Sequence, residues 1–204
     1  MTVHKIYPVG FAANSYILTE DGKNCVVIDP AQPRIADKCR ELGLKPQYVL
    51  LTHCHYDHIG GCGALWEEGE KIMCGKDEKD LIFGVDNRAI FHGITIPKFE
   101  IYKTLSDGEE AELCSMKFKV MFTPGHTRGG VCYICERNIF SGDTLFFESV
   151  GRTDFATGNY NQIVNSIKRL YSLEGDYKVY CGHEDDTTLE HERMHNPYVN
   201  QRNA

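Results

Sequence analysis

The chain has 204 residues, 42% of them hydrophobic and 25% charged, and its formal net charge is −7. This composition predicts one globular domain over residues 1–204 and excludes a disordered or fibrous chain. No basic stripe marks a nucleic-acid partner, and no apolar run approaches the roughly 18 residues of a membrane span.

The start of the chain, MTVHKIYPVG, lacks the charged and apolar regions of an export signal, so we expect a cytoplasmic protein. Nine cysteines, an odd number, then favour free thiols over a disulfide framework. Cys132 and Cys135 form the motif VCYIC within an apolar, strand-like run. Because strand positions three apart face opposite sides, we predict core packing for this pair, not a shared zinc or redox site.

The first half of the chain alternates strand-like and helix-like segments. The turn EDGKN inside residues 15–28 predicts a hairpin, and apolar residues at helical spacing predict a helix from Pro33 to Gly43. The apolar run YVLLT at 48–52 predicts a buried strand, and residues 58–68 are predicted to turn helical. This alternation indicates α/β layering.

The second half begins with an irregular region. Residues 84–98 form either a flap over a site or an ordinary surface connection. Residues 101–140 are strand-like, and 159–173 predict an amphipathic helix. The strand-like YKVYCGH follows, and then a short closing helix begins near Thr188, a predicted N-cap.

A dense group of metal-ligand residues follows the buried strand, in the motif THCHYDHIGG. In an extended segment His53 and His55 point to the same side and can hold one ion. Asp57 and His58 follow where the chain turns toward a helix. The spacing differs from the helical HExxH arrangement, in which two histidines lie one turn apart.

Three later segments repeat one pattern: an apolar run, a glycine and a ligand-type residue. They are KVMFTPGHT with His126, RNIFSGDT with Asp143 and YKVYCGHE with His183. Strand ends that converge on one sheet edge would bring these residues to the THCHYDH segment. Two neighbouring ions need about six or seven ligands. A set of histidine and carboxylate ligands suits zinc, and iron and manganese also accept such ligands.

The motifs HxHxDH, TPGHT, SGD and GHE, in this order, resemble the metallo-β-lactamase superfamily from about residue 10 to residue 198. The resemblance implies a four-layer αββα sandwich of two mixed sheets, with the site at one edge of the sheets. It also implies two metal ions, held by two triads and one bridging residue: His53, His55 and His126; Asp57, His58 and His183; and Asp143.

Within that family the sequence is most similar to the glyoxalase II-like branch, whose members hydrolyse hydroxyacylglutathione. β-Lactamases usually carry arginine at the position of His58 and cysteine at that of Asp143. The segments GDTLFFESVGRTDFATGN and GHEDDTTLEHERMHNPYV also resemble this branch. The resemblance implies metal-assisted hydrolysis of a small-molecule thioester, with Asp57 and Asp143 at the reacting centre.

Five further residues are weaker candidates for contact with the ligands or the substrate. Asp154 either orients a ligand histidine or forms a core salt bridge with Arg152. Cys54 lies between two predicted ligands, and we favour a small loop residue over an oxidation-sensitive thiol. His92 and Phe147 are candidates to touch the substrate.

One departure from glyoxalase II concerns the substrate. That enzyme has an added helical domain that binds glutathione, whereas this sequence stops at Ala204, directly after the catalytic region. We therefore expect a small acyl thioester and no strong selection for glutathione. No basic patch is evident for the carboxylates of glutathione, for which only Lys98 or Arg88 would serve.

The alternative reading is a persulfide dioxygenase, which shares most of these motifs and uses a single iron held by ligands of the His53, His126 and Asp143 type. A non-catalytic metal-binding module is disfavoured because no ligand position is substituted. A nuclease is disfavoured by the acidic, short chain. The sequence leaves the oligomeric state open.

Overall fold

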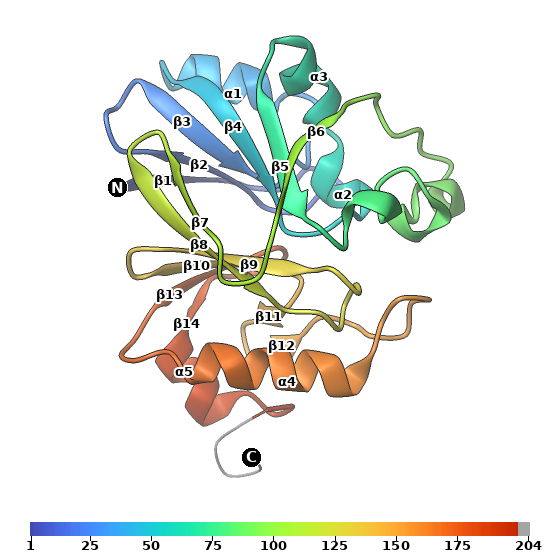
Figure 1. The fold of residues 1–204 in the computed structure, drawn as a ribbon, viewed down its shortest axis with the longest axis vertical. Coiled ribbons are helices and arrows are strands. Elements are labelled where there is room, and N and C mark those ends of the chain that lie inside the picture. Colours follow the sequence, from blue (N-terminus) through green and yellow to red (C-terminus); the bar gives the residue numbers. More distant parts are fainter. Residues whose placement is uncertain (200–204) are drawn as a thin grey trace.

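The computed structural model describes residues 1–199 and contains two six-stranded mixed sheets (Figure 1). The first sheet has the strand order β1(Thr2–Ile6), β2(Ser15–Thr19), β3(Asn24–Ile28), β4(Lys45–Leu51), β5(Lys71–Gly75) and β6(Ile101–Leu105). The second has the order β14(Thr187–Thr188), β13(Lys178–Cys181), β10(Asn138–Gly142), β9(Val131–Cys135), β8(Met116–Phe122) and β7(Glu110–Leu113). A small ribbon pairs β11(Leu145–Phe146) with β12(Ser149–Val150).

Helices cover both outer faces of the paired sheets. Figure 1 shows α1(Ile35–Glu41) and α3(Cys62–Glu67) beside the first sheet, and α4(Tyr160–Tyr171) and α5(Leu189–His195) beside the second. The short α2(Tyr56–Ile59) lies between β4 and α3 in the chain. The four-layer αββα sandwich expected from the motifs is therefore confirmed. No helix within residues 1–199 has the length and apolar character needed to cross a bilayer.

Strand periodicity explains why three apolar layers form. On β3, Cys25 and Val27 pack under the helices on the outer face, whereas Val26 and Ile28 point into the layer between the sheets. Because successive side chains on a strand alternate sides, a strand that is apolar throughout can serve both layers. The same alternation separates the two cysteines of VCYIC, as predicted: Cys132 packs on the outer face of the second sheet and Cys135 between the sheets.

The two predicted C-terminal helices are confirmed, and so is the N-cap predicted at Thr188. Asn159 caps α4 by accepting a hydrogen bond from the Gln162 amide, and Thr188 caps α5 by accepting one from the His191 amide. The hairpin predicted from EDGKN joins β2 to β3.

Two predicted helix boundaries differ from the structure. The first helix begins at Ile35, two residues after Pro33, because a turn closed by Ile35 N–H and the Gln32 carbonyl precedes it. The helix predicted over 58–68 is broken at Gly60 and Gly61. A Cβ on Gly61 would lie 2.4 Å from the Gln32 carbonyl oxygen, so the close passage of these two segments requires glycine and interrupts the helix.

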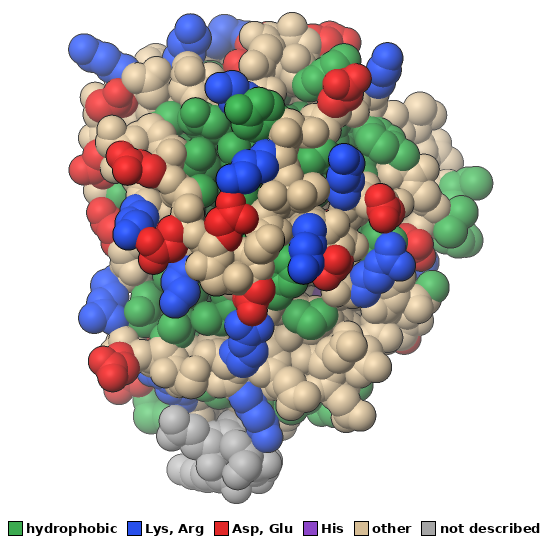
Figure 2. Space-filling model, in the orientation of Figure 1, with side chains coloured by type: hydrophobic (Ala, Val, Ile, Leu, Met, Phe, Trp, Pro, Cys, Tyr) green, Lys and Arg blue, Asp and Glu red, His purple; other side chains and the backbone are tan. Residues whose placement is uncertain are grey.

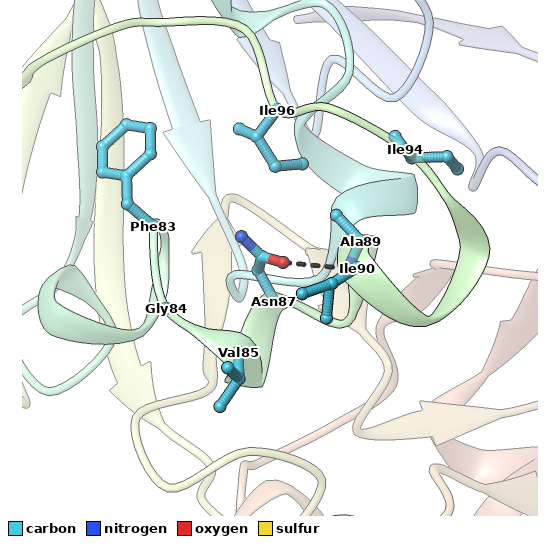
Figure 3. A pocket seen from close by; sticks show the side chains of 8 residues that line it. All are labelled: Phe83, Gly84, Val85, Asn87, Ala89, Ile90, Ile94 and Ile96. Carbon is cyan, nitrogen blue, oxygen red and sulfur yellow. Dashed lines mark hydrogen bonds between the residues drawn. The ribbon is translucent and has the colours of Figure 1, made fainter.

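The irregular region contains three short 3₁₀ turns, η1(Lys79–Leu81), η2(Val85–Asn87) and η3(Ala89–His92), and no α-helix. Residues 83–96 fold around Asn87. Its side-chain NH₂ group donates to the Ile82 carbonyl at 2.6 Å. Its side-chain oxygen accepts from the backbone N–H of Ala89 at 2.9 Å (Figure 3). In the face shown in Figure 2, acidic and basic side chains are interspersed, without a basic stripe.

Candidate metal centre

The candidate metal centre lies at one edge of the two sheets, where four strands end. The ends are Leu51 of β4, Phe122 of β8, Gly142 of β10 and Cys181 of β13. Strands β10 and β13 are parallel, and β8 runs in the same direction because it is separated from β10 by one antiparallel strand. All seven predicted ligand residues therefore lie close together at this edge of the sheets.

The first triad consists of His53, His55 and His126, all buried. His55 Nδ1 lies 3.1 Å from His53 Nε2 and 2.9 Å from His126 Nε2. His126 Nδ1 donates to the Arg152 carbonyl at 2.8 Å, so its Nε2 presents a lone pair. Nitrogen ligands of a tetrahedral zinc ion, each about 2.0–2.1 Å from it, would lie about 3.3 Å apart. The first triad therefore fits a metal ion.

Burial favours the neutral form of these three imidazoles. Desolvation lowers the pKa of His53 and His126, and it lowers the pKa of His55 to about 3. Metals bind the neutral form of histidine, so the first triad needs to release no protons near neutral pH.

The second triad consists of Asp57, His58 and His183, whose ligand atoms lie within 4.8 Å of one another. His183 Nε2 is 3.3 Å from Asp57 Oδ2. His58 Nε2 is fully buried and lies 3.2 Å from Asp143 Oδ1, yet neither atom has a hydrogen-bond partner among the described residues. Two buried polar atoms that face each other without a hydrogen bond can share a cation, so the second triad also fits a metal.

Asp143 lies between the two triads. Its Oδ2 atom is 3.4 Å from His126 Nε2 in the first triad and 3.6 Å from His183 Nε2 in the second. Burial raises the pKa of Asp143, but the neighbouring imidazoles, first that of His58, outweigh this effect and hold it well below its usual value. Gly182 makes the arrangement possible, because a Cβ there would lie 2.3 Å from Asp143 Oδ1.

Asp29 is a residue of the centre that our sequence analysis missed. Its carboxylate accepts from the Thr52 amide at 2.8 Å and the Thr52 hydroxyl at 2.6 Å, and His58 Nδ1 lies 2.8 Å away. Asp29 lies within ligand distance of His53 and His58, but both of its oxygens are used in these bonds, so it orients His58 instead. A signal existed: like the predicted ligands, Asp29 follows an apolar strand, NCVVI, although no glycine precedes it.

Two weaker sequence candidates are placed elsewhere than expected. Asp154 is 65% exposed and pairs with Arg152 at 2.6 Å, so it forms a surface ion pair and orients no ligand histidine. The backbone carbonyl of Arg152 takes that role for His126. Phe147 stacks on His191 with ring centroids 5.1 Å apart, whereas the preceding residue, Phe146, faces the centre. Neighbouring residues of an extended segment point to opposite sides.

Cys54 is fully buried and does not line the pocket over the centre. It lies against Glu78, a buried acid that our sequence analysis also missed. Glu78 accepts from the Thr127 hydroxyl and from the Gly129 amide, so it links the segment of His53 and His55 to the loop of His126. No sequence pattern singles out this glutamate. Burial raises the pKa of Glu78.

We predict that Glu78→Gln retains the fold and that Glu78→Ala destabilises it by about 2–4 kcal/mol, because alanine leaves buried donors of Thr127 and Gly129 unpaired. Folding raises the pKa of Glu78 above 4.5, so its contribution to stability is present below that value and declines as the pH rises through the raised pKa. The free energy of unfolding of the glutamine variant should therefore rise relative to that of the glutamate protein between pH 4.5 and pH 8, measured by urea unfolding of chelator-treated protein. If both variants lost the same free energy of unfolding at both pH values, this role of Glu78 would be contradicted.

A pocket of about 540 Å³ opens over the two triads. Its non-ligand walls include Tyr56, His92, Phe146 and Phe155, and Arg88 and Arg152 also border it. The ring of His92 is tilted by 34° against that of Tyr56, with centroids 4.8 Å apart. The segment 84–98, predicted as either a flap or a surface connection, therefore borders the site.

Comparison with known proteins agrees with this geometry. The family model of the metallo-beta-lactamase superfamily matches residues 8–183. Hydroxyacylglutathione hydrolase GloC of Haemophilus influenzae is 32% identical, over 99% of this chain and 100% of that protein. Among solved structures, BLEG-1 B3 metallo-beta-lactamase superposes with a TM-score of 0.91 at 28% identity, covering 97% of this chain and 99% of that one.

A further solved structure, TTHA1623 in a di-iron-bound form, superposes with a TM-score of 0.84 at 32% identity, covering 98% of this chain and 100% of that one. Together with the αββα sandwich, these matches extend over nearly the whole chain. The chain therefore belongs to the metallo-β-lactamase superfamily, a metal-dependent family.

Proposed function

We propose that this protein is a binuclear metal-dependent hydrolase of acyl thioesters of the hydroxyacylglutathione type. One observation carries the proposal: two complete triads of ligand-type residues share the carboxylate of Asp143. The name of GloC, which this chain matches along its whole length, supports the thioester, and the di-iron form of TTHA1623 supports two ions. Zinc is the metal we expect, and iron or manganese would suit the same ligands.

Two bound ions would supply a nucleophilic water near neutral pH and polarise the substrate carbonyl. The residues of the chain hold this arrangement in place. Burial raises the pKa of Asp57, but its hydrogen bond with His183 helps to lower it overall, so Asp57 is ionised and can accept a hydrogen bond from water in the pocket. Asp29 and the Arg152 carbonyl hold His58 and His126 with their Nε2 atoms turned to the centre.

Hydrolysis of the thioester requires no nucleophilic side chain. The oxygen of water bonds to the carbonyl carbon, the carbon–sulfur bond breaks, and the products are a carboxylic acid and a thiol. Phe146 and Phe155 line the pocket and would give the thioester an apolar wall to lie against. Asp143 and Asp57 are the residues we expect at the reacting centre.

A mononuclear iron dioxygenase would require only His53, His126 and Asp143. One iron would leave the second triad, with His58 fully buried and held by Asp29, without an ion. The completeness of the second triad favours the two-ion hydrolase.

Zinc-loaded protein should hydrolyse S-lactoylglutathione, and chelation should reduce the rate on the order of a thousandfold because both the nucleophile and the carbonyl polarisation are lost. Readdition of zinc after dialysis is the control. Oxygen uptake with glutathione persulfide on one tightly held iron would support the dioxygenase instead. A higher kcat/KM for a cephalosporin reporter would support a β-lactamase.

A further inference from the structure

Arg88 stands out among the basic residues that border the pocket. Its guanidinium is half-buried, and among residues 1–199 it has neither an ion-pair partner nor a side-chain hydrogen bond. The other bordering arginine, Arg152, is neutralised by Asp154. Lys98, the one lysine or arginine of the segment 84–98 besides Arg88, is exposed and does not line the pocket. Arg88 therefore lies beside the candidate metal centre without a salt bridge of its own among residues 1–199, and its charge acts on Asp154, the carboxylate that pairs with Arg152.

Aromatic rings hold the guanidinium in place. Its central carbon lies 4.1 Å from the centroid of Phe155 and 4.8 Å from that of Phe91. Ring faces cover the flat side of a guanidinium and leave its in-plane N–H groups free for a planar acceptor such as a carboxylate. Such an orientation reduces the conformational entropy lost when an anion binds.

The same phenylalanine connects Arg88 to the first triad. The ring of Phe155 packs edge-on against His55, with centroids 5.1 Å apart, and against His126, with centroids 5.5 Å apart. A single ring thus separates the guanidinium from two imidazoles of the centre. A substrate whose thioester lies over the triads and whose carboxylate lies a few bonds from the sulfur would span this separation.

The backbone at Arg88 is also unusual. Its φ is +67°, in the left-handed region that non-glycine residues rarely occupy. The preceding residue, Asn87, fixes this turn through its side-chain bonds to the Ile82 carbonyl and to the Ala89 amide, the second of which is drawn in Figure 3. An arginine kept in a strained position next to a pocket is a candidate for a functional role.

In contrast to the weak selection for glutathione that the sequence predicts, we propose that Arg88 binds a carboxylate on the thiol half of the substrate and thereby selects thioesters of anionic thiols such as glutathione. This inference rests on the proposed hydrolase function. Among hydroxyacylglutathione-type substrates, the thiol half carries the carboxylates and the hydroxyacyl group carries none. A single guanidinium matches one carboxylate, while Asp57, Asp143 and Glu184 at the same pocket disfavour a more highly charged anion.

The kinetic test compares two thioesters with the same lactoyl group, one on glutathione and one on N-acetylcysteamine, which has no carboxylate. Arg88→Gln should lower kcat/KM for the glutathione thioester about tenfold to a hundredfold, the range for a charge-assisted hydrogen bond, and leave the other within about twofold. Arg88→Lys should lower kcat/KM for the glutathione thioester less than Arg88→Gln does, because lysine keeps the positive charge but lacks the planar pair of N–H donors. Lys98→Gln, a matched change in the same segment, should alter neither substrate.

A binding measurement separates this inference from the hydrolase proposal. Calorimetric titration of zinc-loaded protein with S-methylglutathione, a thioether that cannot be hydrolysed, should show a similar weakening in Arg88→Gln. If wild-type protein hydrolyses neither thioester but this weakening occurs, the hydrolase proposal fails and the carboxylate site stands. Equal losses on both thioesters, or unchanged kinetics and binding in Arg88→Gln, would overturn the role of Arg88.

Discussion

Asp143→Ala should reduce the metal content of the purified protein from about two ions per chain to well below one and abolish thioester hydrolysis. The carboxylate lies within 3.6 Å of nitrogens from both triads, so its loss removes a ligand from both candidate sites. It also removes the carboxylate that faces the buried Nε2 atom of His58. Elemental analysis of protein purified without chelator measures the effect.

The matched variant is His58→Ala, which should empty mainly the second triad and leave about one ion per chain. Circular dichroism of both variants separates metal loss from unfolding. A single tightly held iron in wild-type protein, undisturbed by His58→Ala, would contradict the two-ion centre and favour the dioxygenase.

Asp29→Ala should weaken metal binding by about tenfold to a hundredfold although Asp29 is not expected to contact an ion. Alanine leaves the Thr52 amide, the Thr52 hydroxyl and His58 Nδ1 without their buried acceptor, so His58 loses its orientation. Zinc affinity by chelator competition is the measurement.

Asp154→Ala is the control for that experiment. Its carboxylate forms an exposed ion pair with Arg152, and such pairs contribute little, so zinc affinity should not change. Asp29→Asn keeps the shape and an acceptor oxygen and should recover part of the loss. If Asp154→Ala weakened zinc binding as much as Asp29→Ala, the assignment of the orienting role would be wrong.

Local patterns were sufficient to pick out the candidate ligands and to indicate α/β layering, whereas their division between two ions and the four-layer sandwich came from the family resemblance. His53 and His55 alternate on an extended segment after a buried strand, and His126, Asp143 and His183 each follow an apolar run and a glycine. Period-two alternation likewise separated the cysteines of VCYIC, because side-chain direction on a strand depends only on neighbouring positions. Such features need no knowledge of the partner strand.

The supporting contacts depended on which segments the fold brings together. Asp29 meets His58, and Glu78 meets Thr127, only because β3 packs beside β4 and because residue 78 packs against the loop after β8. The turn at Arg88 and its stacking on Phe155 join segments more than sixty residues apart. No local periodicity encodes such pairs, since their energy comes from close packing and paired burial of polar groups, which exist only once the sheets have assembled.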